Sequence, residues 1–387
     1  MPLRDFARHI SGAWLLWPVA GVAALTILSQ AGMGENRTLT TETGPIKVET
    51  VASGLRHPWG LAFLPDRQML VTERPGTLRL VSKDGAISKP LSGVPEVFAQ
   101  GQGGLLDVAI DPDFKSNRLV YLTYAEPGEG GASTAVARGK LHETGLDNVE
   151  VIFRQQPKVG GGNHFGSRLA FAPDGTLFVT LGERFTFERA QILSNDLGKI
   201  VRINGDGSVH KDNPFVGRQD ARHEIWSYGH RNAQGAAIHP VTGKLWETEL
   251  GPLGGDELNI PLAGKDYGWP VVSWGMHYDG RAIPAPPTHP EFADAIDHWT
   301  PVISPSGITF YTADAIPAWR GNLLIAGLSS EAIVRLTLDG ERVAGEERIP
   351  MGARIRDVVQ GPDGAVYALS DEDDGKILRL TLENSPK

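Results

Sequence analysis

A hairpin-like unit recurs along the chain and constrains its fold more than any other feature. In each copy a short apolar run meets a turn rich in Pro, Asp or Gly, and a second apolar run follows. Several strands per copy at such spacings are typical of a β-propeller, in which each copy forms one blade. The copies start at Leu61, Val108, Leu169, Ala236, Ile308 and Val358. Six copies predict an all-β, six-bladed β-propeller; a β-sandwich or barrel, the alternative, would not use so long a chain.

The composition agrees with many short strands joined by tight turns. The chain holds 47 glycines and 27 prolines, and hydrophobic residues make up 41% of it, enough for a large core. It has no cysteine, which excludes disulfides, thiolate metal sites and a cysteine nucleophile. Its net charge of −9 argues against a dedicated binder of nucleic acid or anionic membranes, because both need a basic face.

The N-terminal segment is predicted to direct export. Residues 13–28 are apolar and uncharged, Arg4 and Arg8 precede them, and residues 29–31 resemble a small-x-small cleavage site. This pattern predicts a cleaved signal, with a retained N-terminal anchor as the alternative. We expect four parts: a signal peptide over residues 1–31, a linker over 32–45, a propeller over 46–382 and a tail over 383–387.

Polar segments, three of them rich in glycine, precede the first strand of four of the predicted hairpins. They cover residues 100–106, 160–168, 228–235 and 354–357. In a propeller, loops that precede the first strands share one rim and converge on the central channel. We therefore expect residues far apart in the sequence to form one functional site at this rim.

His164 and Glu183 are the candidate acid–base residues. His164 lies in one of the glycine-rich segments, and a neutral histidine can act as a general base near neutral pH. Glu183 closes the following hairpin, where its carboxylate could orient the ring and stabilise its protonated form. The alternatives are a loop histidine that satisfies a turn and a solvated turn carboxylate.

Three arginines at the predicted rim indicate an anionic ligand. Arg354 and Arg356 are two residues apart, so on an extended strand both face the same way. Together with Arg231 they could bind carboxylates, because the guanidinium fork matches a carboxylate bidentately. The alternative is that they are surface arginines on a strand edge.

Two further segments contain candidate cation ligands. Gly251 and Pro252 form a turn whose backbone carbonyls could bind a hard cation such as Ca²⁺. Asp256 and Glu257 would serve a second, structural cation or simply solvate a loop. The acidic run over residues 371–375 lacks the spacing of an EF-hand and is interpreted as an exposed hairpin turn.

Taken jointly, the motifs resemble those of the soluble aldose sugar dehydrogenases that depend on pyrroloquinoline quinone (PQQ), relatives of soluble quinoprotein glucose dehydrogenase. The resemblance covers about residues 46–382, and that family's fold is a six-bladed propeller. It is carried by residues 57–61 (HPWGL), 101–106 (GQGGLL), 162–166 (GNHFG), 212–215 (DNPF), 229–232 (GHRN), 251–252 (GP), 266–270 (DYGWP) and 354–357 (RIRD).

The resemblance implies a catalytic role for His164, Glu183 and Arg231. His164 would take the proton from the anomeric hydroxyl of an aldose while a hydride passes to PQQ. Glu183 would support that histidine. Arg231 would stabilise the negative charge that develops on the quinone oxygen.

The resemblance also implies two cofactors, PQQ and Ca²⁺. Beside PQQ, the carbonyls of Gly251 and Pro252 would bind one Ca²⁺. Glu257 and the backbone of Tyr267 would bind a second, structural Ca²⁺. The residues that would hold PQQ are Gln102, His164, Arg231, Asn232, Arg354 and Arg356.

Two positions depart from the family's pattern. Ser329 stands where relatives usually carry a lysine that contacts PQQ, and Leu250 stands where they carry His or Gln. The loss of one cation is expected to weaken PQQ binding without abolishing it, because three arginines remain.

The partners implied are a small aldose substrate and an electron acceptor, either soluble or a membrane quinone or cytochrome, with no nucleic acid. The protein would be periplasmic and a monomer or homodimer. Two other classes stay open: a calcium-dependent propeller hydrolase of the lactonase type, and a non-catalytic propeller binding module. The arginine-rich rim argues against the first, and the presence of His164 and Gln102 argues against the second.

Overall fold

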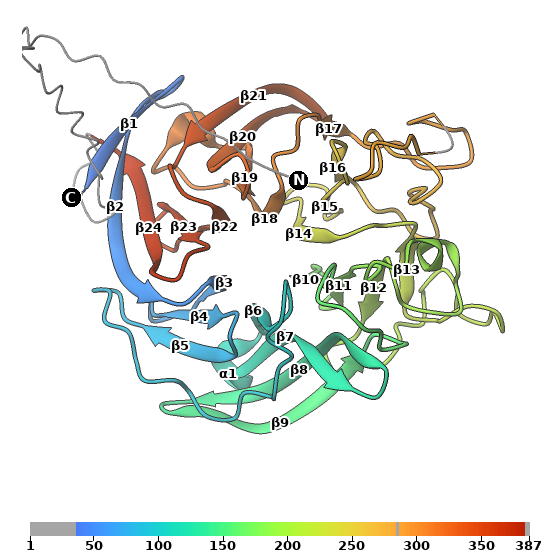
Figure 1. The fold of residues 1–387 in the computed structure, drawn as a ribbon. Coiled ribbons are helices and arrows are strands. Elements are labelled where there is room, and N and C mark those ends of the chain that lie inside the picture. Colours follow the sequence, from blue (N-terminus) through green and yellow to red (C-terminus); the bar gives the residue numbers. More distant parts are fainter. Residues whose placement is uncertain (1–35, 284–285, 384–387) are drawn as a thin grey trace, which may run out of the picture. The chain divides into compact units, whose positions relative to one another are not determined.

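The computed structural model describes residues 36–283 and 286–383, so the predicted signal peptide over residues 1–31 lies outside the described residues. Within the described residues, the strands form six antiparallel sheets around a common centre (Figure 1). Five sheets are built from consecutive strands, and one combines strands from both ends of the described chain. This arrangement confirms the predicted six-bladed β-propeller.

The first three sheets of consecutive strands consist of β3 (Pro58–Phe63), β4 (Met69–Glu73) and β5 (Thr77–Val81); of β6 (Leu105–Ile110), β7 (Leu119–Gly128), β8 (Gly131–His142) and β9 (Gly145–Arg154); and of β10 (Gly166–Phe171), β11 (Leu177–Leu181), β12 (Lys199–Ile203) and β13 (Ile225–Tyr228). The next two consist of β14 (Ala233–Ile238), β15 (Leu245–Glu249), β16 (Asp256–Asn259) and β17 (Asp297–Trp299); and of β18 (Pro305–Phe310), β19 (Leu323–Gly327), β20 (Ala332–Asp339) and β21 (Arg342–Pro350).

The sixth sheet closes the ring of sheets. Its strands, in spatial order, are β1 (Arg37–Thr41), β2 (Gly44–Leu55), β24 (Gly375–Leu382), β23 (Val366–Ser370) and β22 (Ile355–Gln360). In the pairing of β2 with β24, Ile46 lies opposite Leu382. Strand β1 falls inside the predicted linker over residues 32–45, so the sheet begins at Arg37 rather than at residue 46.

Helical structure is limited to three short turns among the described residues. These are α1 (Phe114–Asn117), η1 (Phe187–Gln191) and η2 (Pro317–Trp319). In this part of the chain, no helix has the length and apolar character needed to cross a membrane.

The six predicted hairpins form the first two strands of the six sheets, from β3–β4 to β22–β23. In five of these hairpins, the second strand is buried at every position, as in β11 and β19. Both faces of such a strand pack against neighbouring sheets. This packing explains why the sequence shows continuous apolar runs rather than alternating ones.

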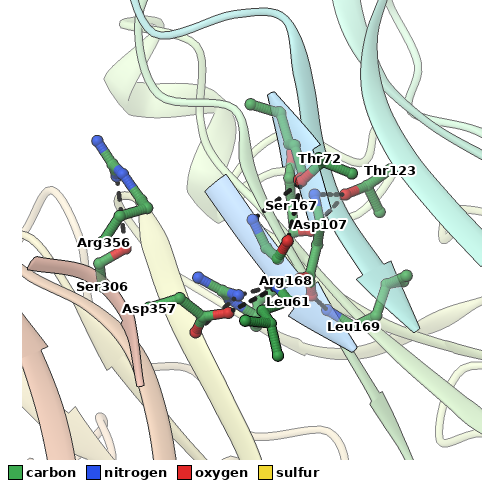
Figure 2. Close-up of polar contacts among 12 residues, drawn as sticks. Leu61, Thr72, Asp107, Thr123, Ser167, Arg168, Leu169, Ser306, Arg356 and Asp357 are labelled. Carbon is green, nitrogen blue, oxygen red and sulfur yellow. Dashed lines mark hydrogen bonds and ion pairs between the residues drawn. The ribbon is translucent and has the colours of Figure 1, made fainter. Parts of the chain in front are cut away.

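A buried ion network, the central hub, consists of Asp107, Arg168 and Asp357 (Figure 2). One Nη of Arg168 on β10 lies 3.0 Å from Asp107 on β6 and 3.2 Å from Asp357 on β22. The two aspartates also accept backbone N–H groups from Leu169 (2.8 Å) and Leu61 (3.2 Å). The hub therefore joins β3, β6, β10 and β22 at the centre of the ring.

Burial of the central hub disfavours the ionised form of its two aspartates. It raises the pKa of Asp107 to about 6 and raises the pKa of Asp357 above its usual range, although the Arg168 charge opposes both shifts. Close packing requires glycine opposite each carboxylate, because a Cβ at Gly60 would clash with Asp107 and one at Gly307 with Asp357.

Candidate active site

The loops that precede three first strands, β6, β10 and β14, are tied together by hydrogen bonds at one rim. Gln102 precedes β6, and its Oε1 accepts the His164 N–H at 2.8 Å. Asn232 precedes β14, and its Oδ1 accepts the Gly166 N–H at the start of β10 (3.0 Å). The Arg231 carbonyl accepts the N–H of Glu183 (3.0 Å). The structure thus brings together residues that lie up to 130 positions apart in sequence, between Gln102 and Asn232.

His164 and Glu183 form a buried pair at this rim. The His164 Nδ1 lies 2.9 and 3.0 Å from the two carboxylate oxygens of Glu183. Both residues are almost completely buried. The His164 Nε2 has no hydrogen-bond partner among the described residues, so it is the ring nitrogen that a ligand can reach.

The surroundings of His164 favour its neutral form. Burial lowers the pKa of the imidazole below its usual range. The charges of Arg231 and Arg184 lower the pKa further, whereas the hydrogen bond and charge of Glu183 raise it. The pair therefore has a neutral ring nitrogen available to accept a proton, together with a carboxylate that stabilises the resulting cation.

The loops approach closely enough to require glycine. A Cβ at Gly182 would clash with the His164 carbonyl, and a Cβ at Gly101 with the Gly162 carbonyl. His164 itself has a φ of 54°, an uncommon left-handed conformation for a residue other than glycine. The glycines of these motifs thus allow the backbone of one loop to pack directly against the backbone of another.

Gln102, Arg354 and Arg356 line one cavity of about 150 Å³, together with Trp59, Arg74, Gly101, Gln234 and Asp371. Arg356 is buried, and its guanidinium donates to the Gln234 Oε1 (2.7 Å) and to the Asp371 Oδ2 (2.5 Å). Arg354 is about half exposed and lines the same cavity. The prediction that both arginines face the same way therefore agrees with the structure.

Asp371 corrects the interpretation of residues 371–375 as an exposed turn. They do lie in the turn between β23 and β24, but the Asp371 side chain is only 7% exposed. Burial opposes ionisation of Asp371, yet the charge and hydrogen bond of Arg356, with help from His57 and Arg354, hold the pKa of its carboxyl well below its usual range. Asp371 thus carries a negative charge inside the arginine-lined cavity.

Arg231 occupies a different part of the rim. One of its Nη atoms donates to the carbonyls of Leu250 (2.7 Å) and Gly251 (2.8 Å), and the other to the Tyr278 hydroxyl (3.0 Å). Its guanidinium carbon also lies 5.2 Å from the centre of the Trp269 ring. A cationic side chain is therefore already bound to one of the carbonyls predicted to hold Ca²⁺.

Three of the predicted cofactor residues have buried N–H groups without a partner among the described residues. These are the Nε of Arg231, the Nδ2 of Asn232 and the Nε of Arg356. Unpaired buried donors are costly, and a ligand rich in carboxylate and carbonyl oxygens would satisfy them. The donor set therefore fits a planar, acidic quinone such as PQQ.

The predicted metal residues Gly251, Glu257 and Tyr267 line one small void with Arg231 and Glu249. Its volume of about 10 Å³ admits a single water-sized particle. Burial, followed by the charge of Glu249, raises the pKa of Glu257 to about 8. The buried carboxylate of Glu249 and the partly buried one of Glu257, beside carbonyl oxygens, are a donor set that fits Ca²⁺.

Three other predicted positions are placed differently. Pro252 is buried but does not line this void. Asp256 accepts three backbone N–H groups, from Gly251, Ile303 and Ser304 (2.7–2.9 Å), so its carboxylate holds loops together. Ser329, in the position of the family's lysine, is exposed at the end of β19 and does not line the cavity with Arg354 and Arg356.

Several site residues were missed by sequence reasoning. Gln234 and Asp371 bind Arg356 from 122 and 15 positions away, and no local motif marks either contact. Phe185, 46% exposed, places its ring 4.7 Å from the His164 ring. The only signal in the sequence for Phe185 was an aromatic residue two positions after the predicted carboxylate.

The fold and the rim together define a six-bladed propeller enzyme with a histidine–carboxylate pair beside an arginine-lined cavity. The chain matches the glucose/sorbosone dehydrogenase family over residues 55–379 and belongs to it. It is 44% identical over 352 residues to aldose sugar dehydrogenase YliI of Escherichia coli strain K12, covering 88% of this chain and 94% of YliI.

Solved structures agree with this assignment. The soluble aldose sugar dehydrogenase of Escherichia coli in its apo form is 43% identical, with a TM-score of 0.85; the match covers 87% of this chain and 100% of that one. The PQQ-bound aldose sugar dehydrogenase of Streptomyces coelicolor is 31% identical, with a TM-score of 0.72, covering 87% and 97% of the two chains. The resemblance seen in the sequence motifs is thereby confirmed.

Proposed function

We propose that this protein is a periplasmic quinoprotein that oxidises the anomeric hydroxyl of aldoses to lactones with PQQ as its cofactor. The observation that carries the proposal is the buried His164–Glu183 pair, whose Nε2 has no partner among the described residues, at the same rim as unpaired donors of Arg231, Asn232 and Arg356. A base alone would suit many reactions, whereas the cationic donor set suits an acidic quinone. PQQ is bound in the Streptomyces coelicolor relative.

Each residue of the pair has a defined task in this reaction. His164 accepts the proton of the anomeric hydroxyl at Nε2. Glu183 holds the ring through Nδ1 and stabilises the positive charge that the ring then carries. PQQ, when bound, supplies the electrophilic quinone carbon that accepts the hydride from the anomeric carbon.

Gln102, Arg354 and Arg356, which line one cavity, would hold PQQ together with Arg231 and Asn232. Arg231 would also stabilise negative charge on the quinone oxygen. The carbonyls of Gly251 and Pro252 would bind the Ca²⁺ that polarises the quinone. For this, Arg231 must release the Gly251 carbonyl and turn toward the cofactor.

Glu257 and Tyr267 would hold a second, structural Ca²⁺ in the void that they share with Glu249. Binding there would offset the charge of the buried carboxylates. The partner that takes up the electrons of the oxidised aldose would be a soluble acceptor or a membrane quinone or cytochrome. A hydrolase would instead need a pocket of carboxylate and amide oxygens around its metal, and the arginine-lined cavity does not offer one.

The decisive experiment is reconstitution. Apoprotein mixed with PQQ and Ca²⁺ is expected to retain PQQ through gel filtration, measured by absorbance, and to reduce a redox dye when an aldose is added. His164→Ala should retain PQQ but lose turnover. Absence of both PQQ retention and aldose-dependent dye reduction in the wild type would overturn the proposal.

A further inference from the structure

An exposed aromatic ring lies directly against the catalytic pair. The Phe185 ring centre is 4.7 Å from that of His164, and 46% of the residue is exposed. Phe187 packs behind it, with ring centres 5.3 Å apart. A phenylalanine that stays half exposed gains little from folding, so burial in the core does not explain its position.

The backbone that presents this ring is strained. Arg184 and Phe185 have φ angles of 59° and 62°, two consecutive left-handed residues that are not glycine. Such conformations are costly for bulky side chains and persist only where the surroundings impose them. Strain of this kind clusters at functional sites, and here it directs the Phe185 ring toward His164.

Buried contacts hold both strained residues in place. The Glu183 carboxylate, already bonded to His164, accepts the Phe185 N–H at 2.6 Å. The Arg184 guanidinium donates to the Gly161 carbonyl (2.7 Å) and lies over the Phe165 ring at 3.6 Å. One carboxylate therefore fixes both the general base and the aromatic ring beside it.

We propose that Phe185 is a specificity-determining residue, the platform on which the apolar C–H face of an aldopyranose ring stacks while its anomeric hydroxyl binds the His164 Nε2. This inference rests on the proposed function. A sugar ring bound at Nε2 must lie against the neighbours of His164. The arginines, Gln102 and Asn232 offer only polar contacts, whereas the Phe185 ring offers an apolar face, and pyranoses present apolar C–H groups on the faces of the ring.

The test compares three substitutions of Phe185. Each keeps a Cβ, so none relieves the strain of the left-handed backbone as a glycine would. Phe185→Ala is expected to raise KM for an aldopyranose by about tenfold while kcat stays within about threefold, because stacking acts on binding rather than on proton transfer. Phe185→Tyr should resemble the wild type, and Phe185→Leu should lie between the two. Val241→Ala, which truncates an 86% exposed apolar side chain in the β14–β15 turn, should change neither constant.

Two further measurements separate the possible results. PQQ retention after gel filtration should be equal in all variants; loss of PQQ in the Phe185 variants would overturn the platform, because the ring would then contact the cofactor. Saturation-transfer NMR of the aldonolactone product on the holoenzyme should label its ring C–H protons, and Phe185→Ala should remove this signal.

Failure of this inference differs from failure of the proposed function. If the wild type oxidises aldoses and Phe185→Ala and Phe185→Leu keep its KM, the platform is refuted while the enzyme assignment stands. If the wild type neither binds PQQ nor oxidises aldoses, the proposed function is refuted, and with it the proposed role of Phe185. Phe185→Leu keeps most of the side-chain volume, so the test does not depend on whether Phe185→Ala folds.

Discussion

At His164, opposing influences act on a single imidazole. Burial and two neighbouring arginines favour the neutral ring, whereas Glu183 favours the protonated one. A general base must be neutral before it accepts a proton, and its protonated form must be stable afterwards. The net lowering of the pKa keeps the base ready at neutral pH, and the Glu183 contact stabilises the product of proton transfer.

This balance predicts the pH dependence of aldose oxidation. Below its pKa the imidazole is charged and cannot accept a proton, so kcat/KM should fall on the acid side with an apparent pKa below the usual value for histidine. Glu183→Gln removes a charge that raises this pKa, so its acid limb should move to lower pH while kcat falls. His164→Ala should lower kcat about 10²–10⁴-fold. Steady-state kinetics across the acid range measure both effects, and an acid limb at higher pH in Glu183→Gln would contradict the assignment.

How far single residues could be predicted depends on where their partners lie. His164, Glu183 and Arg231 stand in loops before or after predicted strands, so the propeller topology alone places them at one rim. Gln234 on β14 contacts Arg356 from another sheet, whereas Asp371 contacts Arg356 from the β23–β24 turn of the same sheet. No local motif marks either contact, because the first depends on packing between blades and the second on the conformation of the turn.

Among the elements, the strands of the hairpins can be predicted from the sequence, whereas the outer strand β1 cannot. The six hairpins combine continuous apolar runs with Pro, Asp and Gly turns, and both signals have a direct physical cause. Strand β1 has the sequence RTLTT, with mostly partly buried or exposed positions at the outer edge of its sheet. It pairs with β2 through a short turn after Thr41, but it lacks a continuous apolar run, which explains why the region was expected to be a linker.

The β23–β24 turn supports a second prediction, because it places the Asp371 carboxylate among arginines of the cavity. Asp371→Asn removes this charge but keeps a hydrogen-bond acceptor for Arg356, so the cavity becomes more positive. The affinity for PQQ, an acidic ligand, should rise about fivefold at low salt and less at high salt.

Fluorescence titration of apoprotein with PQQ measures this change. Asp374→Asn is the matched control, since Asp374 lies in the same turn but is exposed. Weaker PQQ binding in Asp371→Asn would show that orienting Arg356 matters more than the charge of the cavity.

For the whole molecule, the central hub predicts a stability that depends on pH. Arg168→Met leaves two buried carboxylates without their cation, which should lower the free energy of unfolding by about 3–5 kcal/mol. Asp107 has a folded pKa of about 6, above that of an unfolded aspartate, so the folded protein takes up a proton as the pH falls through this value. Without Arg168 the pKa of Asp107 and Asp357 rises further, so the loss of stability should be smaller at pH 5 than at pH 8.

Urea unfolding at the two pH values measures this difference. Arg320→Met is the control, because Arg320 pairs with Asp314 on an exposed surface, where such pairs contribute about 0–1 kcal/mol. A loss for Arg168→Met that is equal at both pH values would mean that the carboxylates do not titrate in this range.

The sheet that joins β2 to β24 also sets the order in which the ring can be completed. Its strands come from both ends of the described chain, with residues 44–55 beside residues 375–382. During synthesis β2 is made early, but its partner leaves the ribosome only after the other five sheets have been made. Until then, one edge of β2 has no strand to pair with, and the sheet that closes the ring cannot form. Completion of the ring is therefore a late, long-range event, and the exposed edge of β2 is the segment that must be protected from aggregation until β24 has been made.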